Sequence, residues 1–584
     1  MGNFLRLMVF VRKYWAWFVL AFICLVANTG FGLVVPWLIR EAIDTVISKG
    51  ESSFLVLAAA AIIGASILRG AFAYGNHYIG EVTSQKIAYD IRNAIYDQLQ
   101  RLSFAYHDRT QTGQLMSRAT VDVEAVRMFL GRGLMSIVQV IVMFIAITCI
   151  LVMMNWPLAL FCTVFMAIIS FRAVIVGKIL RPIWLKIQQL IGFLGTTLEE
   201  NLTGVRIVKS FSRQGEESRK FASDATLLYN EQINAARQMA FNVPLMVFLI
   251  SLPTALILWY GGRQVIDGNL TVGGLSQFIL YLGMLAMPVR RLGMVTNLIS
   301  RAISAGQRIM EILDTESPVQ EKPGAVELGQ LRGQVSFENV SFGYDSSSPV
   351  LKGVSFSVQP GELVALVGSL GSGKSTLAQL IPRFYDVTGG AIRMDGTDIR
   401  DATITSLRRN VGIVQQDIFL FSATIRDNIA YGAVGADIKQ IEAAARAASL
   451  HDFIQSLPDG YETWVGERGV TLSGGEKQRL AIARTLLMTP GVLILDDSMS
   501  SVDTKTERLI RSALNELIKA RTTFIITHRL SLIKNADIIL VMREGKVVER
   551  GKHDELMANK GYYCQIYQSQ LSATQDSEDE VIGE

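Results

Sequence analysis

Long apolar stretches alternate with polar segments over the first half of this chain. Six of the apolar stretches approach or exceed the roughly 20 helical residues that cross about 30 Å of hydrocarbon. Two of them are interrupted by an arginine, Arg69 in the second and Arg172 in the fourth. The pattern predicts six membrane-spanning helices, over residues 14–39, 54–76, 133–154, 156–178, 240–262 and 274–292.

Two longer polar segments, at about residues 77–132 and 179–239, separate the spans. In the first segment, apolar residues recur at helical spacing at Ile91, Ile95 and Leu99. Because this period runs into the neighbouring spans without a break, we expect the membrane helices to extend far beyond the bilayer, each pair closed by a short turn. A separate globular domain in each segment is the alternative.

Lys and Arg are concentrated in these two polar segments, whereas the connections after the first, third and fifth spans contain few of them. By the positive-inside rule, the polar segments and both termini are expected in the cytoplasm. Only about a dozen residues precede the first apolar stretch, which is also too long to be the core of a signal peptide. We therefore expect a multi-pass protein of the plasma or inner membrane, embedded in the lipid bilayer.

The pattern changes after residue 315. Residues 316–332 are rich in Pro, Gly and Glu and predict a linker. Over residues 333–569, short β-branched runs alternate with helical patterns, which predicts an α/β domain. Residues 570–584 are acidic, lack aromatic side chains and are expected to be disordered. The predicted fold is a membrane α-helical domain over residues 1–315, with six transmembrane helices and long cytoplasmic extensions, fused to an α/β domain.

Composition agrees with this division. Half of the residues are hydrophobic and only 18% are charged, and the mean hydropathy of +0.32 exceeds that of an ordinary soluble domain. The net charge of +4 is small, and no basic tract is long enough to indicate nucleic acid as a partner. The four cysteines lack metal-ligand spacing and predict no disulfide framework.

A glycine-rich segment in the second half has the context of a phosphate-binding P-loop. It follows an apolar run at residues 363–367 and precedes a helical pattern. Its glycines let backbone N–H groups approach phosphates, Lys374 should reach the β- and γ-phosphates of a nucleotide, and Ser375 should ligate Mg²⁺. The candidate nucleotide-binding residues of this loop are Gly368, Ser369, Gly371, Ser372, Gly373, Lys374, Ser375 and Thr376.

Two further features fit nucleotide chemistry. Asp496 ends the apolar run at residues 492–495 and is the expected acidic partner for the metal. The segment 472–478 opens a predicted helix, whose N-terminal dipole and free N–H groups suit a γ-phosphate. A Gly-Gly pair before a helix also occurs in ordinary loops. The candidate phosphate-binding residues of this second segment are Ser473, Gly474, Gly475 and Glu476.

The order of these motifs along nearly the whole chain resembles an ATP-binding cassette half-transporter of the exporter type, with the membrane domain ahead of the cassette. Segments 112–122 and 204–211 resemble the family's two coupling-helix regions, and segment 463–469 resembles its cross-talk loop. In that family the segment 472–478 is the signature that closes over a neighbour's nucleotide. The motifs are Tyr344, the P-loop, Gln416, the signature, Asp496, Asp503 and His528.

The resemblance implies roles for single residues. Tyr344 would stack on adenine, Gln416 would contact Mg²⁺ and link the site to the membrane helices, and His528 would hold the γ-phosphate. Asp503 belongs to the same nucleotide-binding set. A cassette of this family cannot place its own signature on its own P-loop, so two cassettes must pair head to tail. ATP and Mg²⁺ are the expected ligands.

One position departs from the family pattern. The residue after the metal-binding Asp496 is usually a Glu that acts as general base, and here it is Asp497. The missing methylene withdraws the carboxylate, and a misplacement of about 1 Å can lower a rate on the order of 100-fold. We expect ATP binding at this P-loop with slow hydrolysis.

The chain therefore resembles the Asp-bearing subunit of heterodimeric bacterial multidrug exporters, whose partner supplies Glu. A heterodimer with a degenerate ATP site on this chain is expected. A homodimer with two slow sites is the alternative.

The implied activity is ATP-driven export of amphipathic or hydrophobic substrates, drugs or lipids, by alternating access. Methionines in the third, fifth and sixth spans suit an adaptable apolar site, although packing explains them as well. Arg69 and Arg172 either line a cavity or lie at span ends and reach toward water. A homodimeric exporter, a lipid flippase, an importer with the same architecture and an ATP-gated channel are the rival functions.

Overall fold

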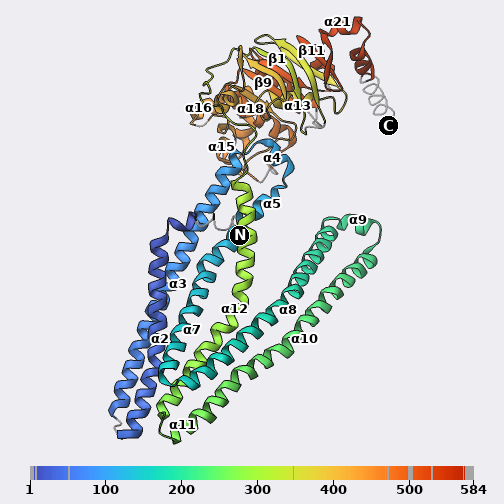
Figure 1. The fold of residues 1–584 in the computed structure, drawn as a ribbon. Coiled ribbons are helices and arrows are strands. Elements are labelled where there is room, and N and C mark those ends of the chain that lie inside the picture. Colours follow the sequence, from blue (N-terminus) through green and yellow to red (C-terminus); the bar gives the residue numbers. More distant parts are fainter. Residues whose placement is uncertain are drawn as a thin grey trace. The chain divides into compact units, whose positions relative to one another are not determined.

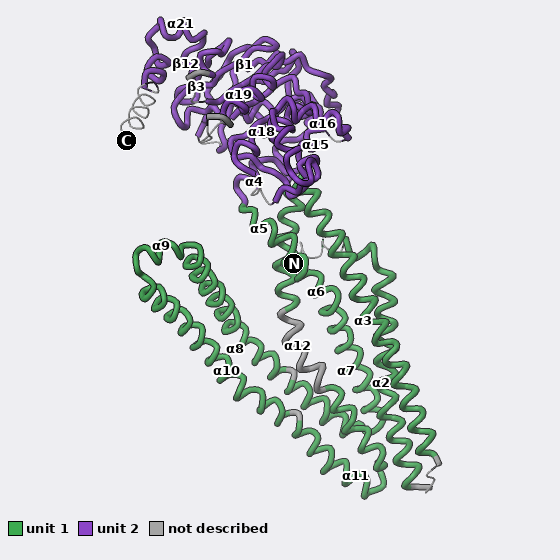
Figure 2. The backbone as a smooth tube through the Cα atoms, turned by 180° about the vertical axis from the view of Figure 1, so that it is seen from behind, with its two compact units in different colours: residues 1–100, 111–315 green, residues 101–110, 316–584 purple. Residues whose placement is uncertain are grey.

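The computed structural model describes residues 6, 9–49, 53–345, 348–433, 435–466, 469, 472–496, 504–527, 530–569 and 571. The chain forms two compact units (Figure 2). The first contains residues 1–100 and 111–315, and the second contains residues 101–110 and 316–584. The expected first domain, residues 1–315, thus differs from the structure at residues 101–110, which pack with the second unit.

The first unit consists of helices (Figure 1). Three of its short elements, η1 to η3, are π-helical turns within longer helical segments. The helices are α2 (Trp15–Lys49), α3 (Ser53–Arg101), α5 (Thr112–Ser117), η1 (Arg118–Asp122), α6 (Val123–Met128), η2 (Phe129–Gly133), α7 (Leu134–Met154), α8 (Trp156–Thr203), α9 (Val205–Ser210), α10 (Gln214–Leu256), η3 (Ile257–Gly261), α11 (Gly262–Ile266) and α12 (Val272–Leu313).

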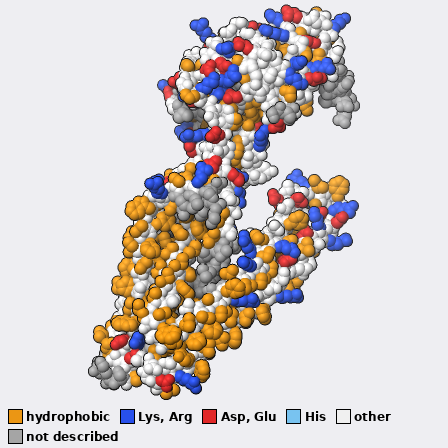
Figure 3. Space-filling view, in the orientation of Figure 1, with side chains coloured by type: hydrophobic (Ala, Val, Ile, Leu, Met, Phe, Trp, Pro, Cys, Tyr) orange, Lys and Arg blue, Asp and Glu red, His pale blue; other side chains and the backbone are white. Residues whose placement is uncertain are grey.

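Five helical segments of the described chain are long and apolar enough to cross a membrane, and hydrophobic side chains cover much of their visible surface (Figure 3). The expected sixth span, residues 274–292, lies on α12, where only Val272–Leu285 counts as apolar helix. The side chains of residues 286–297, over which the expected span continues, lie outside the described residues. The five segments are Trp15–Ile47, Phe54–Arg101, Thr112–Met154, Trp156–Thr203 and Gln214–Ile266.

The helices continue well past the length that hydrocarbon requires. The α3 helix has 49 residues, which at 1.5 Å per residue is about 74 Å. The α8 and α10 helices run side by side and are joined by α9 (Figure 1). The helical period predicted at residues 77–132 and 179–239 is therefore present as helix, and neither segment forms a globular domain among the described residues.

Side-chain packing and ion pairs hold α12 among its neighbours. Phe278 and Leu282 of α12 are buried in a cluster with Ile147 of α7. Farther along α12, Arg308 donates from Nε to Oδ2 of Asp122 in η1 at 2.7 Å, and Asp122 is only 5% exposed. Apolar burial and a buried charge pair therefore both fix α12 within the first unit.

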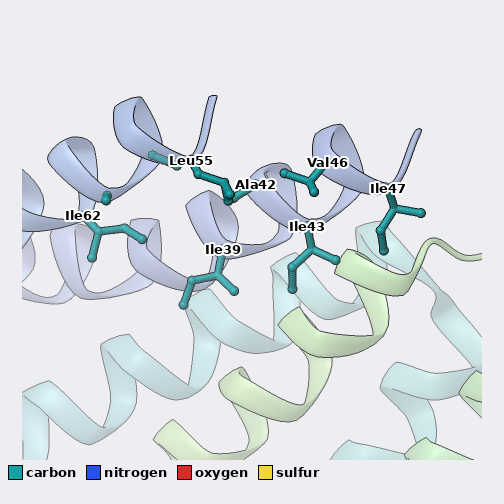
Figure 4. Close-up of a pocket in the computed structure, with 9 residues that line it drawn as sticks. Ile39, Ala42, Ile43, Val46, Ile47, Leu55 and Ile62 are labelled. Atoms are coloured by element: carbon teal, nitrogen blue, oxygen red, sulfur yellow. The ribbon is translucent and has the colours of Figure 1, made fainter. Parts of the chain in front are cut away.

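An aliphatic pocket of about 430 Å³ lies between α2 and α3 (Figure 4). Its residues recur at helical spacing on both helices, so one face of each helix forms a wall. None of the described side chains that line the pocket can form a hydrogen bond, which separates it from any site for phosphates. Its lining residues are Ile39, Ala42, Ile43, Val46, Ile47, Leu55, Ala58, Ala59 and Ile62.

The described residues of the second unit form three sheets. A six-stranded sheet has the order β12-β11-β3-β10-β9-β6, a four-stranded sheet has the order β2-β1-β4-β5, and β7 pairs with β8. The strands are β1 (Val335–Phe342), β2 (Leu351–Val358), β3 (Leu363–Gly368), β4 (Gly389–Met394), β5 (Thr397–Asp398), β6 (Val411–Val414), β7 (Ala423–Thr424), β8 (Trp464–Val465), β9 (Val492–Asp496), β10 (Thr522–Ile526), β11 (Ile538–Arg543) and β12 (Lys546–Gly551).

Helices accompany these sheets in the second unit. The first of them, α4, comes from the segment 101–110. The helices are α4 (Phe104–Arg109), α13 (Lys374–Leu380), α14 (Ile404–Arg409), α15 (Ile425–Ala430), α16 (Ile438–Ala447), α17 (His451–Ser456), η4 (Gly460–Glu462), α18 (Gly474–Met488), α19 (Thr504–Ile518), α20 (Leu530–Lys534) and α21 (His553–Ala558).

The central strands of the six-stranded sheet are buried on both faces. Along β3, Val364 and Leu366 belong to one hydrophobic cluster, whereas Ala365 and Val367 belong to another. This alternation follows from the two-residue period of a strand. From β6 to β11 the strands are parallel, so their carboxyl ends meet at one edge, where α/β sheets bind ligands.

Candidate nucleotide-binding site

The P-loop connects β3 to α13 and folds around its own lysine. Lys374 is 8% exposed, and its Nζ donates to the carbonyl oxygens of Gly368 and Ser369, each at 2.8 Å. Burial lowers the pKa of the Lys374 ammonium, and the nearby Asp496 carboxylate opposes that shift. The ammonium therefore lies within the loop, where it can exchange carbonyl partners for phosphate oxygens.

The backbone of the loop leaves room for a phosphate. Gly371 has φ of 76° and Gly373 has φ of 101°, a region that favours glycine. The position of a Cβ on Gly371 meets no atom within 4 Å. The hydroxyl-bearing Ser375 is exposed in the first turn of α13. The loop thus fits the phosphates of a nucleoside triphosphate, and the Ser375 hydroxyl is available to hold the Mg²⁺ bound to it.

Strand order places Asp496 and Gln416 at the same edge as the P-loop. Ile526, at the end of β10, pairs with Leu366 of β3 on one side and with Asp496 of β9 on the other. The next strand, β6, ends at Val414, and the exposed Gln416 follows two residues later. Among the described residues no cluster of three His, Cys, Asp or Glu side chains could hold a metal alone. That is compatible with Mg²⁺, which keeps waters and phosphate oxygens among its ligands.

Tyr344 lies beside the P-loop helix. Its hydroxyl is 3.2 Å from Oγ1 of Thr376 and donates to Oε1 of Gln379 at 3.1 Å. The ring is 43% exposed and meets Tyr385 edge-on, with 5.3 Å between ring centroids. An aromatic ring is therefore available next to the P-loop, and its stacking on adenine stays a prediction.

The signature segment forms the start of α18. Ser473 accepts a hydrogen bond from the N–H of Glu476 at 3.4 Å, and the Ser473 N–H donates to Oε2 of Glu476 at 2.8 Å. This capping box satisfies two groups of the first turn. Ser473 and Gly474 are exposed, Gly475 is buried, and no atom lies within 4 Å of a Cβ position on Gly474. The start of α18 is therefore exposed at Ser473 and Gly474.

Three of the predicted site residues lie outside the described residues. They are Asp497, which follows β9, Asp503, which precedes α19, and His528, which follows β10. Their positions along the chain place them next to the carboxyl ends of strands or the start of a helix that the structure does describe. Their roles stay predictions.

Sequence reasoning missed the segment that packs on this unit beside Tyr344. Phe104 of α4 stacks on Phe384, with 4.1 Å between ring centroids. The Tyr385 hydroxyl donates to the Asp108 carboxylate. Burial, followed by this carboxylate, raises the pKa of Tyr385. The available signal was the pair of aromatic residues Phe104 and Tyr106 shortly after Ser103, in an otherwise polar segment.

The two predicted coupling segments lie in the first unit. Arg118 forms an ion pair with Glu311 of α12 at 3.3 Å, and Asp122 pairs with Arg308. Both side chains therefore serve packing within the helical unit. The other segment contains α9, in which Ile207 is 65% exposed, and Phe211, directly after α9, is 73% exposed.

Comparison with known proteins agrees with this geometry. Residues 18–289 match the family described as "ABC transporter transmembrane region", and residues 351–500 match the family described as "ABC transporter". An "ATP-dependent lipid A-core flippase" of Syntrophus aciditrophicus is 38% identical over 583 residues, which cover 100% of this chain and 96% of the relative. A "putative multidrug export ATP-binding/permease protein", YgaD of Bacillus subtilis, is 37% identical over 574 residues, which cover 97% of this chain and 99% of the relative.

A solved structure extends the match to three dimensions. The structure of a bacterial Atm1-family ABC exporter with ATP bound has a TM-score of 0.80 and 32% sequence identity. The alignment covers 95% of this chain and 98% of that chain. The chain belongs to the ATP-binding cassette transporters, as an exporter-type half-transporter in which ATP hydrolysis is coupled to transport across a membrane.

Proposed function

We propose that this chain is one half of a dimer that exports or flips amphipathic and hydrophobic molecules across the plasma or inner membrane, with its cassette in the cytoplasm. Six spans are part of this proposal, with the sixth on α12. The observation behind it is the start of α18, where Ser473 and Gly474 are exposed toward open space. Among the described residues no hydrogen bond or ion pair links this signature to the chain's own P-loop, so a second cassette would complete the ATP site.

The chemistry divides between two chains. Mg²⁺, bound with ATP, neutralises charge on the β- and γ-phosphates. Ser375, Asp496 and Gln416 would hold it at the P-loop side. The N–H groups at the start of the partner's α18 would face the γ-phosphate from the other side. Because ATP would contact both chains only when the two cassettes are closed on one another, its binding energy can drive their closure.

The identity of the second chain rests on Asp497. A shorter carboxylate at the base position predicts slow hydrolysis at this chain's P-loop. A different half-transporter with Glu at that position would then supply the faster site. A homodimer with two slow sites is the competing composition. Purified alone, this chain should hydrolyse ATP slowly, and Asp497→Glu should raise the rate by a factor on the order of 10 to 100. Brisk turnover that Asp497→Glu leaves unchanged would contradict the proposal.

Exposed apolar side chains suggest where the partner docks. Ile207 and Phe211 are exposed next to the tip of the α8–α10 pair. On the second unit, Phe419 and Tyr431 are 52% and 62% exposed, and Phe421 packs against both. Exposed aromatic residues of this kind mark interaction surfaces. We place the partner's α9 region on this aromatic surface.

The substrate class rests on the relatives. Of the methionines that suggested an adaptable cavity, Met135 and Met143 are buried and Met246 packs against a helical core. Arg172 donates to Oδ1 of Asn242 at 2.8 Å, which ties α8 to α10. Packing therefore accounts for these three methionines. The relatives named as a lipid A-core flippase and a multidrug exporter support a lipid or a drug as substrate.

Transport in proteoliposomes tests the function. With ATP and Mg²⁺ outside the proteoliposomes, transporters whose cassettes face outward should move a fluorescent phospholipid or a hydrophobic dye across the membrane against its gradient, and Lys374→Ala should abolish this movement. Downhill ion conductance would indicate a channel, and transport only in the opposite direction would indicate an importer. Either result would contradict export.

A further inference from the structure

A polar pocket in the second unit lies between the linker and the segment that follows α13. Its volume is about 440 Å³. One wall is formed by linker residues 316–322, and the other contains Arg383, Asp386 and Arg400. None of these residues belongs to the P-loop or to the signature. The pocket therefore needs an explanation apart from ATP binding.

Arg383 forms the buried end of this pocket. The side chain is 2% exposed. Its Nε donates to Oδ1 of Asp386 at 2.6 Å, and its Nη2 donates to Oδ2 of Asp386 at 3.1 Å and to the carbonyl oxygen of Gln320 at 2.9 Å. Its Nη1 is buried without a hydrogen-bond partner. Buried polar groups in folded proteins nearly always have partners, so this guanidinium has donors to spare for a ligand.

Two further cations face the same space. Lys322 donates to Oδ1 of Asp401 at 2.6 Å and is otherwise exposed. Arg400 donates to both oxygens of Asp398 through Nε and Nη2. Neither Asp398 nor Asp401 lines the pocket. The unused N–H groups of these cations can therefore serve a ligand without breaking the existing pairs.

The two carboxylates that line the pocket leave its cations available to an anion. Both oxygens of Asp386 accept from Arg383, so its charge is already paired. Glu316 is exposed and can turn into solvent. The donors that face the pocket are thus Arg383, Arg400 and Lys322. Forked guanidinium groups with a lysine form the set that proteins use for phosphate.

We propose that this pocket binds a small phosphate-bearing anion, held by Nη1 of Arg383 together with Arg400 and Lys322. Arg383 already holds the linker through the Gln320 carbonyl. A bound phosphate would add Lys322 of the linker to the same cluster and fix the linker more firmly on the cassette. Because this linker follows α12, the anion would regulate how the cassette is attached to the transmembrane helix.

Hydrogen–deuterium exchange on the full chain in lipid nanodiscs tests the site with inorganic phosphate as the probe. Ligand binding suppresses local opening by the factor 1 + [L]/Kd, so phosphate at about ten times Kd should slow exchange of linker residues 316–322 by about tenfold. Arg400→Ala and Lys322→Ala should remove most of this protection. Arg383→Lys, which keeps the charge but replaces the forked guanidinium with a single ammonium, should weaken it.

Three controls separate this site from other causes. Lys374→Ala weakens phosphate binding at the P-loop and should leave the linker protection unchanged. Arg393→Ala removes an arginine that pairs with Glu338 outside this pocket and should also have no effect. Equal slowing in sodium chloride of the same ionic strength, slowing confined to residues 368–376, or protection that survives both Arg400→Ala and Lys322→Ala would each overturn the proposal.

Discussion

Arg109 of α4 is hydrogen-bonded to Tyr344, the residue predicted to stack on adenine. Its Nη2 donates to the main-chain carbonyl oxygen of Tyr344 at 3.0 Å. The same nitrogen donates to Oδ1 of Asp345 at 2.7 Å. The segment 101–110 therefore touches the backbone that carries the Tyr344 ring. This segment directly follows α3 in the chain. A movement of the Tyr344 backbone can therefore be transmitted along the chain to a transmembrane helix.

Removing this contact should weaken ATP binding. Arg109→Ala should raise the KM for ATP about two- to fivefold, because exposed charged contacts contribute about 0.5 to 1 kcal/mol. Substrate stimulation of the ATPase should fall by more than the basal rate. Arg446→Ala is a matched control, since Arg446 is similarly exposed and pairs with Glu442 on α16. An unchanged KM and unchanged stimulation in Arg109→Ala would show that the contact has no role in coupling.

Alanine substitutions at two glycines should distinguish the effect of backbone strain from the effect of a steric clash. Gly373 and Gly396 both have positive φ, at 101° and 84°. A Cβ on Gly373 would lie 2.8 Å from Cδ2 of Leu351, whereas a Cβ on Gly396 meets nothing within 4 Å. Gly396→Ala should cost about 1 kcal/mol of stability and leave ATP binding intact. Gly373→Ala should also abolish ATP binding, measured with a fluorescent nucleotide, because the P-loop must shift. Equal affinities in the two variants would refute this explanation.

Alkaline pH should destabilise the second unit. Burial raises the pKa of Tyr461 and of Tyr563, each to about 12. An unfolded chain releases these protons near pH 10, so between about pH 10 and 12 the unfolded state binds fewer protons than the folded state. Stability is then complete below pH 10 and falls by about 1.4 kcal/mol per pH unit for each tyrosine. Thermal unfolding between pH 8 and 11.5 measures this slope. Tyr461→Phe should reduce it, and an unaltered slope would exclude Tyr461 as a source.

The Asp122–Arg308 pair should be essential to the packing of α12. Arg308→Ala leaves the Asp122 carboxylate buried without its bidentate partner, which should cost about 1 to 3 kcal/mol. The double variant with Asp122→Asn should recover part of this loss, because no unpaired charge remains. Thermal unfolding followed by circular dichroism gives both values. Strictly additive losses would mean that the two side chains do not stabilise one another.

The sequence pattern was sufficient for features that depend on local chemistry. A strand, a glycine-rich turn and a helix were predicted around Lys374 because each element has its own local signal, and β3 and α13 lie there. The same holds for the N-terminus of α18, since Ser473 and Glu476 are neighbours in sequence. The match of the chain to both transporter families agrees with these motifs.

Features that depend on distant contacts were not predicted. The α4 helix has only six residues, too few for a helical period, and it is defined by the stacking of Phe104 on Phe384. Two further features depend on side-chain positions. The Lys374 ammonium donates to a carbonyl oxygen of its own loop, and Nη1 of Arg383 has no hydrogen-bond partner. The sequence carries no local signal for either.

The central claim is that ATP is enclosed between the P-loop of one chain and the signature of another. The direct measurement is cross-linking from a cysteine introduced at Ser473 in the otherwise cysteine-free full chain, in membranes, with ATP and Mg²⁺ under non-hydrolysing conditions. The account predicts an ATP-dependent link to the P-loop of a second chain, whose sequence by mass spectrometry distinguishes another copy from a different half-transporter. ATP binding without any such link between chains would contradict the account.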